Sequence, residues 1–368
     1  MDDQTALILA LQLIALCCIA AALLLYLLCR IRNRYIAGSG QDQDDPEVTL
    51  NLGLGRAVLV TSCDTAFGLQ CALHLSNLGF RVFAGLKDPD ANGRDDATEG
   101  GSLAARILRA KIKEREMLNS ECASEASAPP SGAAVGALIT IPLDVTREDM
   151  LHEAVVLIRR NLPAGEDGLW AVLNTAGMCC KGRLENQENA HWDVMLKYNV
   201  VGALRTARTF MPLLKNKKGR LINMGANINH TNNPGSGLVA YTAARYAVEG
   251  ASTALRHEMA PHGIHVITLQ PNGVALEKIF AAPRLDTSDK PSDHTALEIQ
   301  HPANKYLDYN PSVLPSQAMR MIEEALLSKS PKQNYQLLPQ SKLNSLNHSM
   351  LIMKNKIMSA QIKPTQLA

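Results

Sequence analysis

From Arg56 onward, short apolar runs alternate with longer segments that have helical periodicity. Strands that alternate with helices of this length predict βαβ units, and hence a parallel sheet covered by helices on both faces. The expected fold class is therefore α/β, with a doubly wound parallel sheet. We expect six strands, at 57–61, 81–86, 137–142, 169–173, 220–224 and 265–270.

The helices expected between these strands lie at 67–78, 147–161, 192–214 and 241–260. One stretch, 87–136, breaks the pattern, because Asp-rich, Gly-rich and Ala/Ser/Pro-rich pieces surround a charged helical segment at 102–118. We interpret it as a surface insertion that is disordered in part. The pattern predicts one domain over 56–340 and a weakly amphipathic tail over 341–368, which packs on the domain or lies on a membrane surface.

The N-terminal segment 6–29 is apolar except for Gln12. As a helix it spans about 36 Å, enough to cross a hydrocarbon layer of about 30 Å. Three arginines at 30–34 follow it, and by the positive-inside rule they place the rest of the chain in the cytosol. No positive charge precedes the run, which argues against a cleaved signal peptide. We predict a single-pass membrane anchor at 1–35 and a polar linker at 36–55, with a buried core helix as the alternative.

Composition narrows the classes of function. The formal net charge is +2 and aromatic residues make up 4% of the chain, so we expect no nucleic-acid partner. The eight cysteines form no CxxC pair and are interpreted as reduced thiols. His257, His262 and His265 lack the spacing of metal ligands, so no metal site is expected.

A tight turn of small residues joins the first expected strand to the first expected helix. The apolar run 58–61 leads directly into 62–68, where the helix begins. Backbone N–H groups and the helix dipole point at one place in such a turn, and together they favour a bound diphosphate.

The turn TSCDTAFG at 61–68 resembles the TGxxxGxG turn of the short-chain dehydrogenase/reductase superfamily, in the TGCDSGFG form of its retinol, steroid and 3-hydroxybutyrate dehydrogenase branch. The resemblance covers 56–338 and implies a Rossmann-like fold with a substrate lid over 274–309. Further segments resemble the family in the expected order: LDV at 143–145, LWAVLNTAG at 169–177, Asn199 with Gly202, GRLIN at 219–223, Tyr241, and PNG at 271–273.

The resemblance implies a catalytic role for Tyr241 as general acid and base, and for Asn199 as the holder of a water in a proton relay. The lysine of the family, one helical turn after the tyrosine, is Arg245 here. Arginine keeps the positive charge but presents a planar fork instead of a compact ammonium. As an alternative, Arg245 pairs with Glu249 four residues further on.

The catalytic serine of the family corresponds to Ala226 in this chain. Asn227 is our candidate for the missing hydrogen-bond donor, with Asn229 as the alternative. Losing one such donor costs roughly 10²–10³ in rate and leaves the remaining reaction possible.

The resemblance also implies a nicotinamide cofactor, NAD or NADP. Ser62 and Ala66 replace two glycines of the turn, and their Cβ atoms crowd the approach of a diphosphate. Lys87 favours a 2′-phosphate and hence NADP, whereas Asp88 favours NAD, and both remain open. Asp144 lies by the adenine ring, or is the cap of the next helix. The implied cofactor residues are Thr61, Ser62, Asp64, Phe67, Gly68, Lys87, Asp144, Val145, Asn174, Ala176, Gly177, Arg245 and Pro271.

Two functions follow from these features. The first is a membrane-anchored NAD(P)-dependent oxidoreductase, in the endoplasmic reticulum and as a possible homo-oligomer, that interconverts an alcohol and a ketone or aldehyde on a lipophilic substrate such as a steroid or retinoid. The alternative is a catalytically impaired pseudoenzyme of the same fold that binds a cofactor, lipid or protein. A third, less favoured function is that of a structural tether. The motifs still occur in the order of the family, which argues against a purely structural role.

Overall fold

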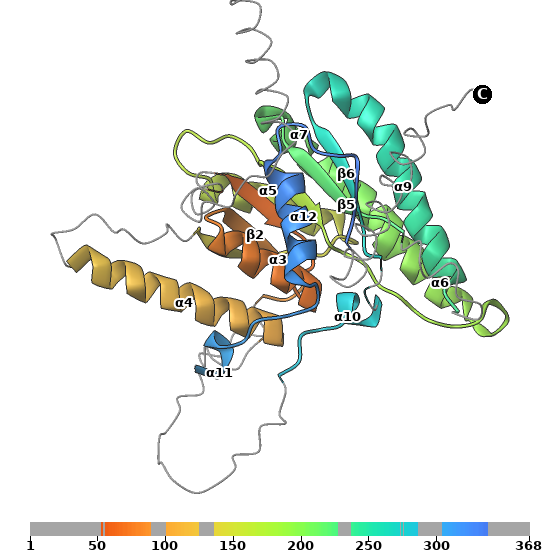
Figure 1. The fold of residues 1–368 in the computed structure, drawn as a ribbon, viewed down its shortest axis with the longest axis horizontal. Helices are drawn as coiled ribbons and strands as arrows, with labels where there is room; N and C mark the ends of the chain where they lie inside the picture. Colours follow the sequence, from red (N-terminus) through yellow and green to blue (C-terminus); the bar gives the residue numbers. More distant parts are fainter. Residues whose placement is uncertain are drawn as a thin grey trace, which may run out of the picture. The chain divides into compact units, whose positions relative to one another are not determined.

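The computed structural model describes residues 53, 56–89, 101–124, 136–226, 237–272, 274, 276–285 and 304–337. These residues contain a seven-stranded sheet in the order β3-β2-β1-β4-β5-β6-β7, and every neighbouring pair of strands is parallel (Figure 1). The expected Rossmann-like α/β class is confirmed. The strands are β1 Ala57–Val60, β2 Arg81–Leu86, β3 Leu138–Pro142, β4 Ala171–Asn174, β5 Arg220–Met224, β6 His265–Gln270 and β7 Asn334–Gln336.

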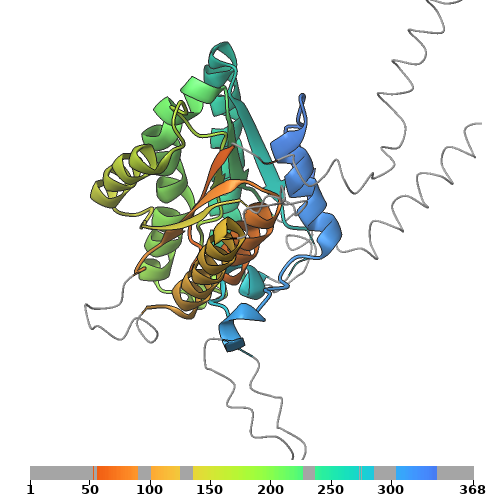
Figure 2. The ribbon, with the colours of Figure 1, turned by 90° about the vertical axis from the view of Figure 1, so that its left-hand side faces the viewer.

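Helices cover both faces of the sheet, and Figure 2 shows α5 and α7 on one side and α12 on the other. Helices α3, α4 and α12 contribute to one apolar cluster, and α5, α7 and the end of α9 contribute to a second. The helices are α3 Ala66–Asn77, α4 Leu103–Ser124, α5 Glu148–Asn161, α6 Asn189–Leu196, α7 Gly202–Lys217, α9 Val239–Met259, α10 Leu276–Phe280, α11 Asn304–Leu307 and α12 Ser316–Leu327, with short turns η1 Leu184–Asn186, η2 Lys197–Val201 and η3 Ala260–His262.

The central strand β1 is apolar throughout because both of its faces are covered. Val58 and Val60 pack into the first cluster, whereas Ala57 and Leu59 pack into the second. This alternation follows from the two-residue period of a strand. A strand buried on both faces therefore has a continuous apolar sequence.

Helix α4 makes the crossover from β2 to β3 and contains most of the predicted helical segment 102–118. Ala104, Ala105, Ile107 and Leu108 are buried in the first cluster. This helix is therefore integrated into the core. The flanking residues 90–100 and 125–135 lie outside the described part of the chain, and the domain boundaries stay predictions.

The single helix predicted at 192–214 is divided in the structure. Helices α6 and α7 are joined by η2, a π-helical turn that contains Asn199. The wider turn buries Asn199 completely beneath the loop that follows β4. π-Turns of this kind are frequent at functional sites.

The predicted anchor, linker and tail lie outside the described residues. Of the helices within 56–337 that the structure describes, none is both long and apolar enough to cross a bilayer.

Candidate functional site

The site lies at the carboxyl ends of β1 and β4, where the connections of the sheet change direction. The chain passes from β1 outward to β2 and β3, then returns to β4 on the other side of β1. In open α/β sheets a ligand binds in the crevice outside such a switch point. The loops that form this crevice run from Thr61 to Thr65 and from Thr175 to Met178.

The turn after β1 keeps a glycine-like backbone although its first glycine is replaced. Ser62 has a φ of 48°, in the left-handed region. The next helix is capped by Thr65, whose Oγ1 accepts the N–H of Gly68 at 3.1 Å and donates to the carbonyl of Ser62 at 2.9 Å. The conformation of the family's turn is therefore present, at a cost in backbone strain.

We expect Ser62→Gly to raise the free energy of unfolding by about 1 kcal/mol, because glycine relieves the left-handed strain. Urea unfolding measures the change. Ser62→Ala is the matched control, since it removes the hydroxyl but keeps the Cβ atom, and it should give no gain. A loss of stability in the glycine variant would show that the Ser62 side chain itself holds the turn.

The N-terminus of α3 packs tightly on this turn. A Cβ atom at Gly68 would overlap the carbonyl oxygen of Ser62, so only glycine allows this approach. The N–H of Ala66 donates to the carbonyl of Ala281 at 2.8 Å. None of the described residues accepts the N–H of Phe67, which leaves this donor of the first turn for a ligand.

Beneath the crevice, polar side chains form a buried ladder across three strands and α9. The Oγ1 of Thr61 donates to Asn174 at 3.3 Å, and Asn174 donates to Asn223 at 3.4 Å. Asn223 in turn donates to the hydroxyl of Ser252 at 3.0 Å. Buried polar groups that are fully paired fix a unique arrangement. The ladder therefore holds the ends of β1, β4 and β5 level with one another.

Three predicted catalytic residues come together above this ladder. Tyr241 lies in the first turn of α9 and Arg245 follows one turn later, with exposed fractions of 2% and 1%. Arg245 donates to the Oδ1 of Asn199 at 3.0 Å and to the carbonyl of Met224 at 3.3 Å. Its guanidinium carbon lies 5.3 Å from the centroid of the Tyr241 ring.

The Tyr241 hydroxyl and the Arg245 Nε are both buried, and among the described residues neither has a hydrogen-bond partner. Arg245 does not pair with Glu249, so that alternative is wrong. Glu249 instead accepts the N–H of Ala226 at 3.1 Å and the side-chain amide of Gln270 at 2.8 Å. Buried polar groups without partners are costly and call for an explanation, of which a ligand is one.

Burial raises the pKa of the Tyr241 phenol, and the adjacent charge of Arg245 opposes this by lowering it. A phenol that loses its proton in a dry site needs a positive neighbour. Arg245 supplies such a neighbour, since its guanidinium carbon lies 5.3 Å from the centroid of the Tyr241 ring.

Asn199 is fixed by the loop after β4. Its Oδ1 accepts the N–H of Met178 at 2.9 Å, and its Nδ2 donates to the carbonyl of the same residue at 2.9 Å. The side chain therefore joins η2, the loop after β4 and Arg245. That Asn199 also holds a water remains a prediction.

The innermost part of the crevice is filled by protein side chains. A Cβ atom at Gly177 would overlap the guanidinium of Arg245 and lie 2.7 Å from the ring of Phe280. The Phe280 ring stands edge-on to Tyr241 at 6.1 Å, and Arg245 lies 5.0 Å from its centroid. Phe280 and Ala281 therefore close the crevice from the side of α10.

The outer end of the crevice carries charge. Asp64 accepts the backbone N–H of Lys87 at 2.8 Å and the hydroxyl of Ser102 at 3.3 Å. Burial raises the pKa of Asp64, and the Lys87 N–H opposes the rise. The Lys87 ammonium donates to the hydroxyl of Tyr198 at 3.0 Å and lies over its ring.

Other predicted site residues have structural contacts. Asp144 accepts both the N–H and the hydroxyl of Thr146 at 2.8 Å, in the turn before α5. The N-cap of α5 is Arg147, so the alternative that Asp144 caps this helix is wrong. Val145 lies against Gly202, where a Cβ atom would be 2.8 Å from its methyl carbon. Ala176 donates its N–H to the Oγ1 of Thr61 at 3.1 Å. Pro271 is buried after β6, and Asn227 lies outside the described residues.

Two residues of the site were missed from the sequence. Phe280 is the only phenylalanine in the predicted lid 274–309. This single aromatic residue was the one sequence signal that could have pointed to its place in the site. Glu249 was considered only as a partner of Arg245. Its contact with Ala226 joins α9 to the loop after β5, a contact that helical periodicity does not indicate.

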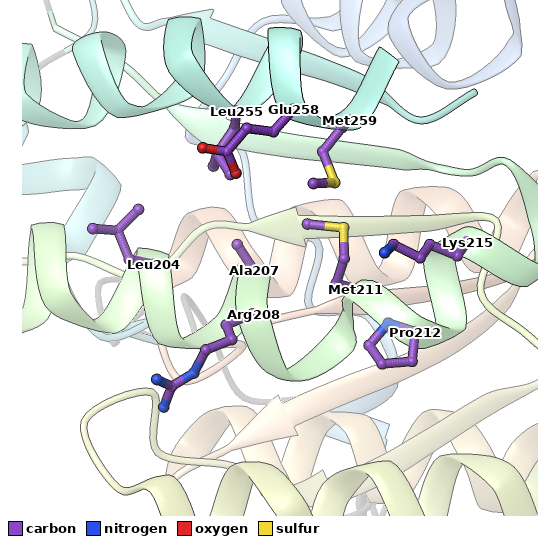
Figure 3. Close-up of a pocket in the computed structure, with 9 residues that line it drawn as sticks. All are labelled: Leu204, Ala207, Arg208, Met211, Pro212, Lys215, Leu255, Glu258 and Met259. Atoms are coloured by element: carbon purple, nitrogen blue, oxygen red, sulfur yellow. The ribbon is translucent and has the colours of Figure 1, made fainter. Parts of the chain in front are cut away.

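A separate groove lies between the outer faces of α7 and α9 (Figure 3). Its volume is about 440 Å³, and its far end is lined by Met211 and Met259. Because Met259 ends α9 and Tyr241 lies in its first turn, this groove is distinct from the crevice.

Comparison with known proteins decides the family. A family model described as short chain dehydrogenase matches residues 100–282, which contain Asn199, Tyr241 and Arg245. The chain belongs to the short-chain dehydrogenase/reductase superfamily.

The relatives of this short-chain dehydrogenase/reductase lie in the predicted branch. It is 30% identical to the mitochondrial D-beta-hydroxybutyrate dehydrogenase of Rattus norvegicus, over 64% of this chain and 60% of that protein. It is 28% identical to the estradiol 17-beta-dehydrogenase 2 of Rattus norvegicus, over 76% of this chain and 67% of that protein. It is 27% identical to the retinol dehydrogenase 7 of Mus musculus, over 68% of this chain and 67% of that protein. The chain thus spans about 60% of the length of the hydroxybutyrate dehydrogenase.

The residues of this short-chain dehydrogenase/reductase fit the diphosphate and adenosine half of a nicotinamide dinucleotide. The left-handed Ser62, the close approach at Gly68 and the N–H of Phe67 form the required turn. Beside Gly177, the Arg245 guanidinium and the Phe280 ring occupy the space that a Cβ atom would need.

Proposed function

We propose that this short-chain dehydrogenase/reductase is an NAD(P)-dependent oxidoreductase that interconverts an alcohol with a ketone or aldehyde on a lipophilic substrate. One observation carries the proposal. The Tyr241 hydroxyl is buried with no hydrogen-bond partner among the described residues, and the Arg245 guanidinium carbon lies 5.3 Å from the centroid of its ring. A phenol in such a place is suited to exchange a proton with a substrate oxygen.

Each residue has a defined task in this proposal. The nicotinamide, when bound, supplies or accepts the hydride. Tyr241 gives its hydroxyl proton to the carbonyl oxygen in reduction and takes it back in oxidation. Arg245 stabilises the phenolate by its charge, and Asn199 orients the Arg245 guanidinium through its Oδ1. The described part of α10 excludes water from Tyr241.

The membrane anchor belongs to the same proposal. The apolar segment 6–29 and the arginines after it support a single-pass anchor with the domain in the cytosol, at the endoplasmic reticulum. Relatives named for estradiol and retinol support a substrate that partitions into lipid. An anchored site meets such a substrate at the membrane surface.

A second candidate function is a pseudoenzyme of the same fold that binds without turnover. Ala226 at the serine position favours it, since a methyl group donates no hydrogen bond. The packing of Phe280 against Gly177 favours it as well.

One experiment separates the two functions. The purified full chain is titrated with NADH and NADPH by calorimetry, and then assayed with a panel of sterols, retinoids and short hydroxy acids. The oxidoreductase requires binding of a dinucleotide and turnover of at least one lipophilic alcohol or ketone. Binding without any turnover supports the pseudoenzyme, and absence of binding refutes the cofactor.

We expect Phe280→Ala to tighten the binding of the dinucleotide by about tenfold, because the closed crevice reduces the fraction of protein that is competent to bind. Calorimetric titration measures the dissociation constant. Lys278→Ala, an exposed change on the same helix, is the control and should leave it unaltered. Weaker binding in the alanine variant would mean that Phe280 contacts the ligand instead of excluding it.

A further inference from the structure

The loop after β4 carries two adjacent cysteines at the side of the crevice. The residue before them, Met178, is held by the side chain of Asn199 through two hydrogen bonds of 2.9 Å. Cys179 and Cys180 are both free and partly exposed, and both pack against the apolar cluster that contains Tyr241. The proposed oxidoreductase mechanism uses neither of these thiols.

Cys179 is the thiol that lies near the reacting group. Burial raises the pKa of Cys179 to about 11, and the charges of Lys181 and Arg245 oppose the rise. A negative charge on Cys179 in turn adds to the rise that burial causes in the pKa of Tyr241. The two side chains are therefore close neighbours, and at neutral pH the sulfur keeps its proton.

A second group at the same place points to a carbonyl compound as the ligand. The Tyr241 hydroxyl is buried, and among the described residues it has no hydrogen-bond partner. A carbonyl oxygen would accept this hydroxyl, and Arg245 would stabilise negative charge that develops on the oxygen. Met178 and Phe280 pack on the same apolar cluster as Tyr241 and favour a lipophilic molecule.

We propose that Cys179 is a covalent modification site for a lipophilic α,β-unsaturated ketone or aldehyde. The carbonyl oxygen and the electrophilic β-carbon of such a molecule belong to one conjugated system, so Tyr241 and Cys179 each engage one end of it. The proposal goes beyond the oxidoreductase function, because the addition needs neither a hydride nor a dinucleotide.

The addition balances without an oxidant or a reductant. The sulfur of Cys179 forms a bond to the β-carbon, and the electron pair of the C=C bond shifts toward the carbonyl oxygen. That oxygen takes the proton of Tyr241, and the thiol proton replaces it on the phenol. The resulting enol returns to the carbonyl form by moving its proton to the α-carbon, and the product is a thioether.

The test follows the adduct on each cysteine by peptide mass spectrometry. The purified full chain, without dinucleotide, is incubated with benzylideneacetone, an aromatic α,β-unsaturated ketone. We expect Cys179 to be labelled at least about tenfold faster than Cys180, because only the first reaction has general acid catalysis. Benzylacetone, which has the same skeleton without the double bond, should give no adduct. Cys180→Ser is the matched control and should leave the labelling of Cys179 unaltered.

Tyr241→Phe tests the role of the hydroxyl. Labelling of Cys179 by benzylideneacetone should slow by at least about tenfold, because the general acid is lost. Iodoacetamide alkylates a thiol by displacing iodide and needs no proton on its carbonyl oxygen. Its rate at Cys179 should therefore be the same in this variant and in the wild-type protein, which shows that access to the thiol has not changed.

The outcomes separate this proposal from the oxidoreductase function. Labelling of Cys179 no faster than that of Cys180 overturns the site. An unaltered rate of benzylideneacetone labelling in Tyr241→Phe overturns the role of the hydroxyl and the proposal with it. Neither result bears on dinucleotide binding or turnover. The expected labelling in a protein that binds neither NADH nor NADPH would support the covalent site and refute the oxidoreductase.

Discussion

Tyr241→Phe should lower turnover by about 10³-fold while the affinity for the dinucleotide stays within twofold. The substitution removes a hydroxyl oxygen for which the described residues provide no well-formed hydrogen bond, so we expect little change in the stability of the fold. It also removes the proton that the substrate oxygen must receive. Steady-state rates and calorimetric titration of the same preparation measure the two quantities.

The control for this variant is Tyr246→Phe. Tyr246 lies on the same helix with 45% of its surface exposed, and its change should alter neither quantity. Full activity in Tyr241→Phe would assign the proton transfer to another group.

Oxidation by the wild-type protein should also accelerate with rising pH, since burial raises the pKa of Tyr241 and the phenolate is the base in that direction.

Ala226→Ser should raise turnover by about 10²-fold, because it restores a hydrogen-bond donor to the substrate oxygen. The loss of one such donor lowers kcat by about 10²–10³-fold. The backbone at this position is already held, since the Ala226 N–H donates to Glu249. The rise should appear in kcat with little change in affinity for the dinucleotide, because the hydroxyl contacts the reacting oxygen.

The control for this gain is the double variant Ala226→Ser with Tyr241→Phe, which should return to the low rate of the tyrosine variant. An unchanged rate in Ala226→Ser would show that another donor already serves the substrate oxygen. Asn227 is our candidate for that donor, and Asn227→Ala would then be the next variant.

Six of the seven strands could be predicted, because they have short apolar sequences between helical segments. The seventh strand, β7, was not expected, since only Tyr335 of its three residues is buried. The division of the long helix at η2 could not, because a π-turn adds one residue without changing the apolar pattern around Asn199. The extent of α4 was likewise hidden by its high charge, although Ile107 and Leu108 are fully buried.

In the site, Tyr241 and Arg245 could be placed together because residues four apart share a helix face. The closure by Phe280 could not be predicted, since it depends on contacts between residues more than 30 positions apart in the chain. The contact of Asp64 could not be predicted either, since its partner Lys87 follows the end of β2, 23 positions further along the chain. The sequence shows which chemical groups are available, whereas the tertiary contacts determine which of them face the crevice.

The buried ladder of polar side chains from Thr61 to Ser252 affects how the crevice responds to heat and denaturant. It crosses the sheet between β1 and α9, so no single one of these elements can detach without breaking it. The backbone amides beneath the ladder should therefore exchange with deuterium only through global unfolding, at one common rate. The floor of the crevice is then rigid, and the segments above it are the ones that change conformation to fit different ligands.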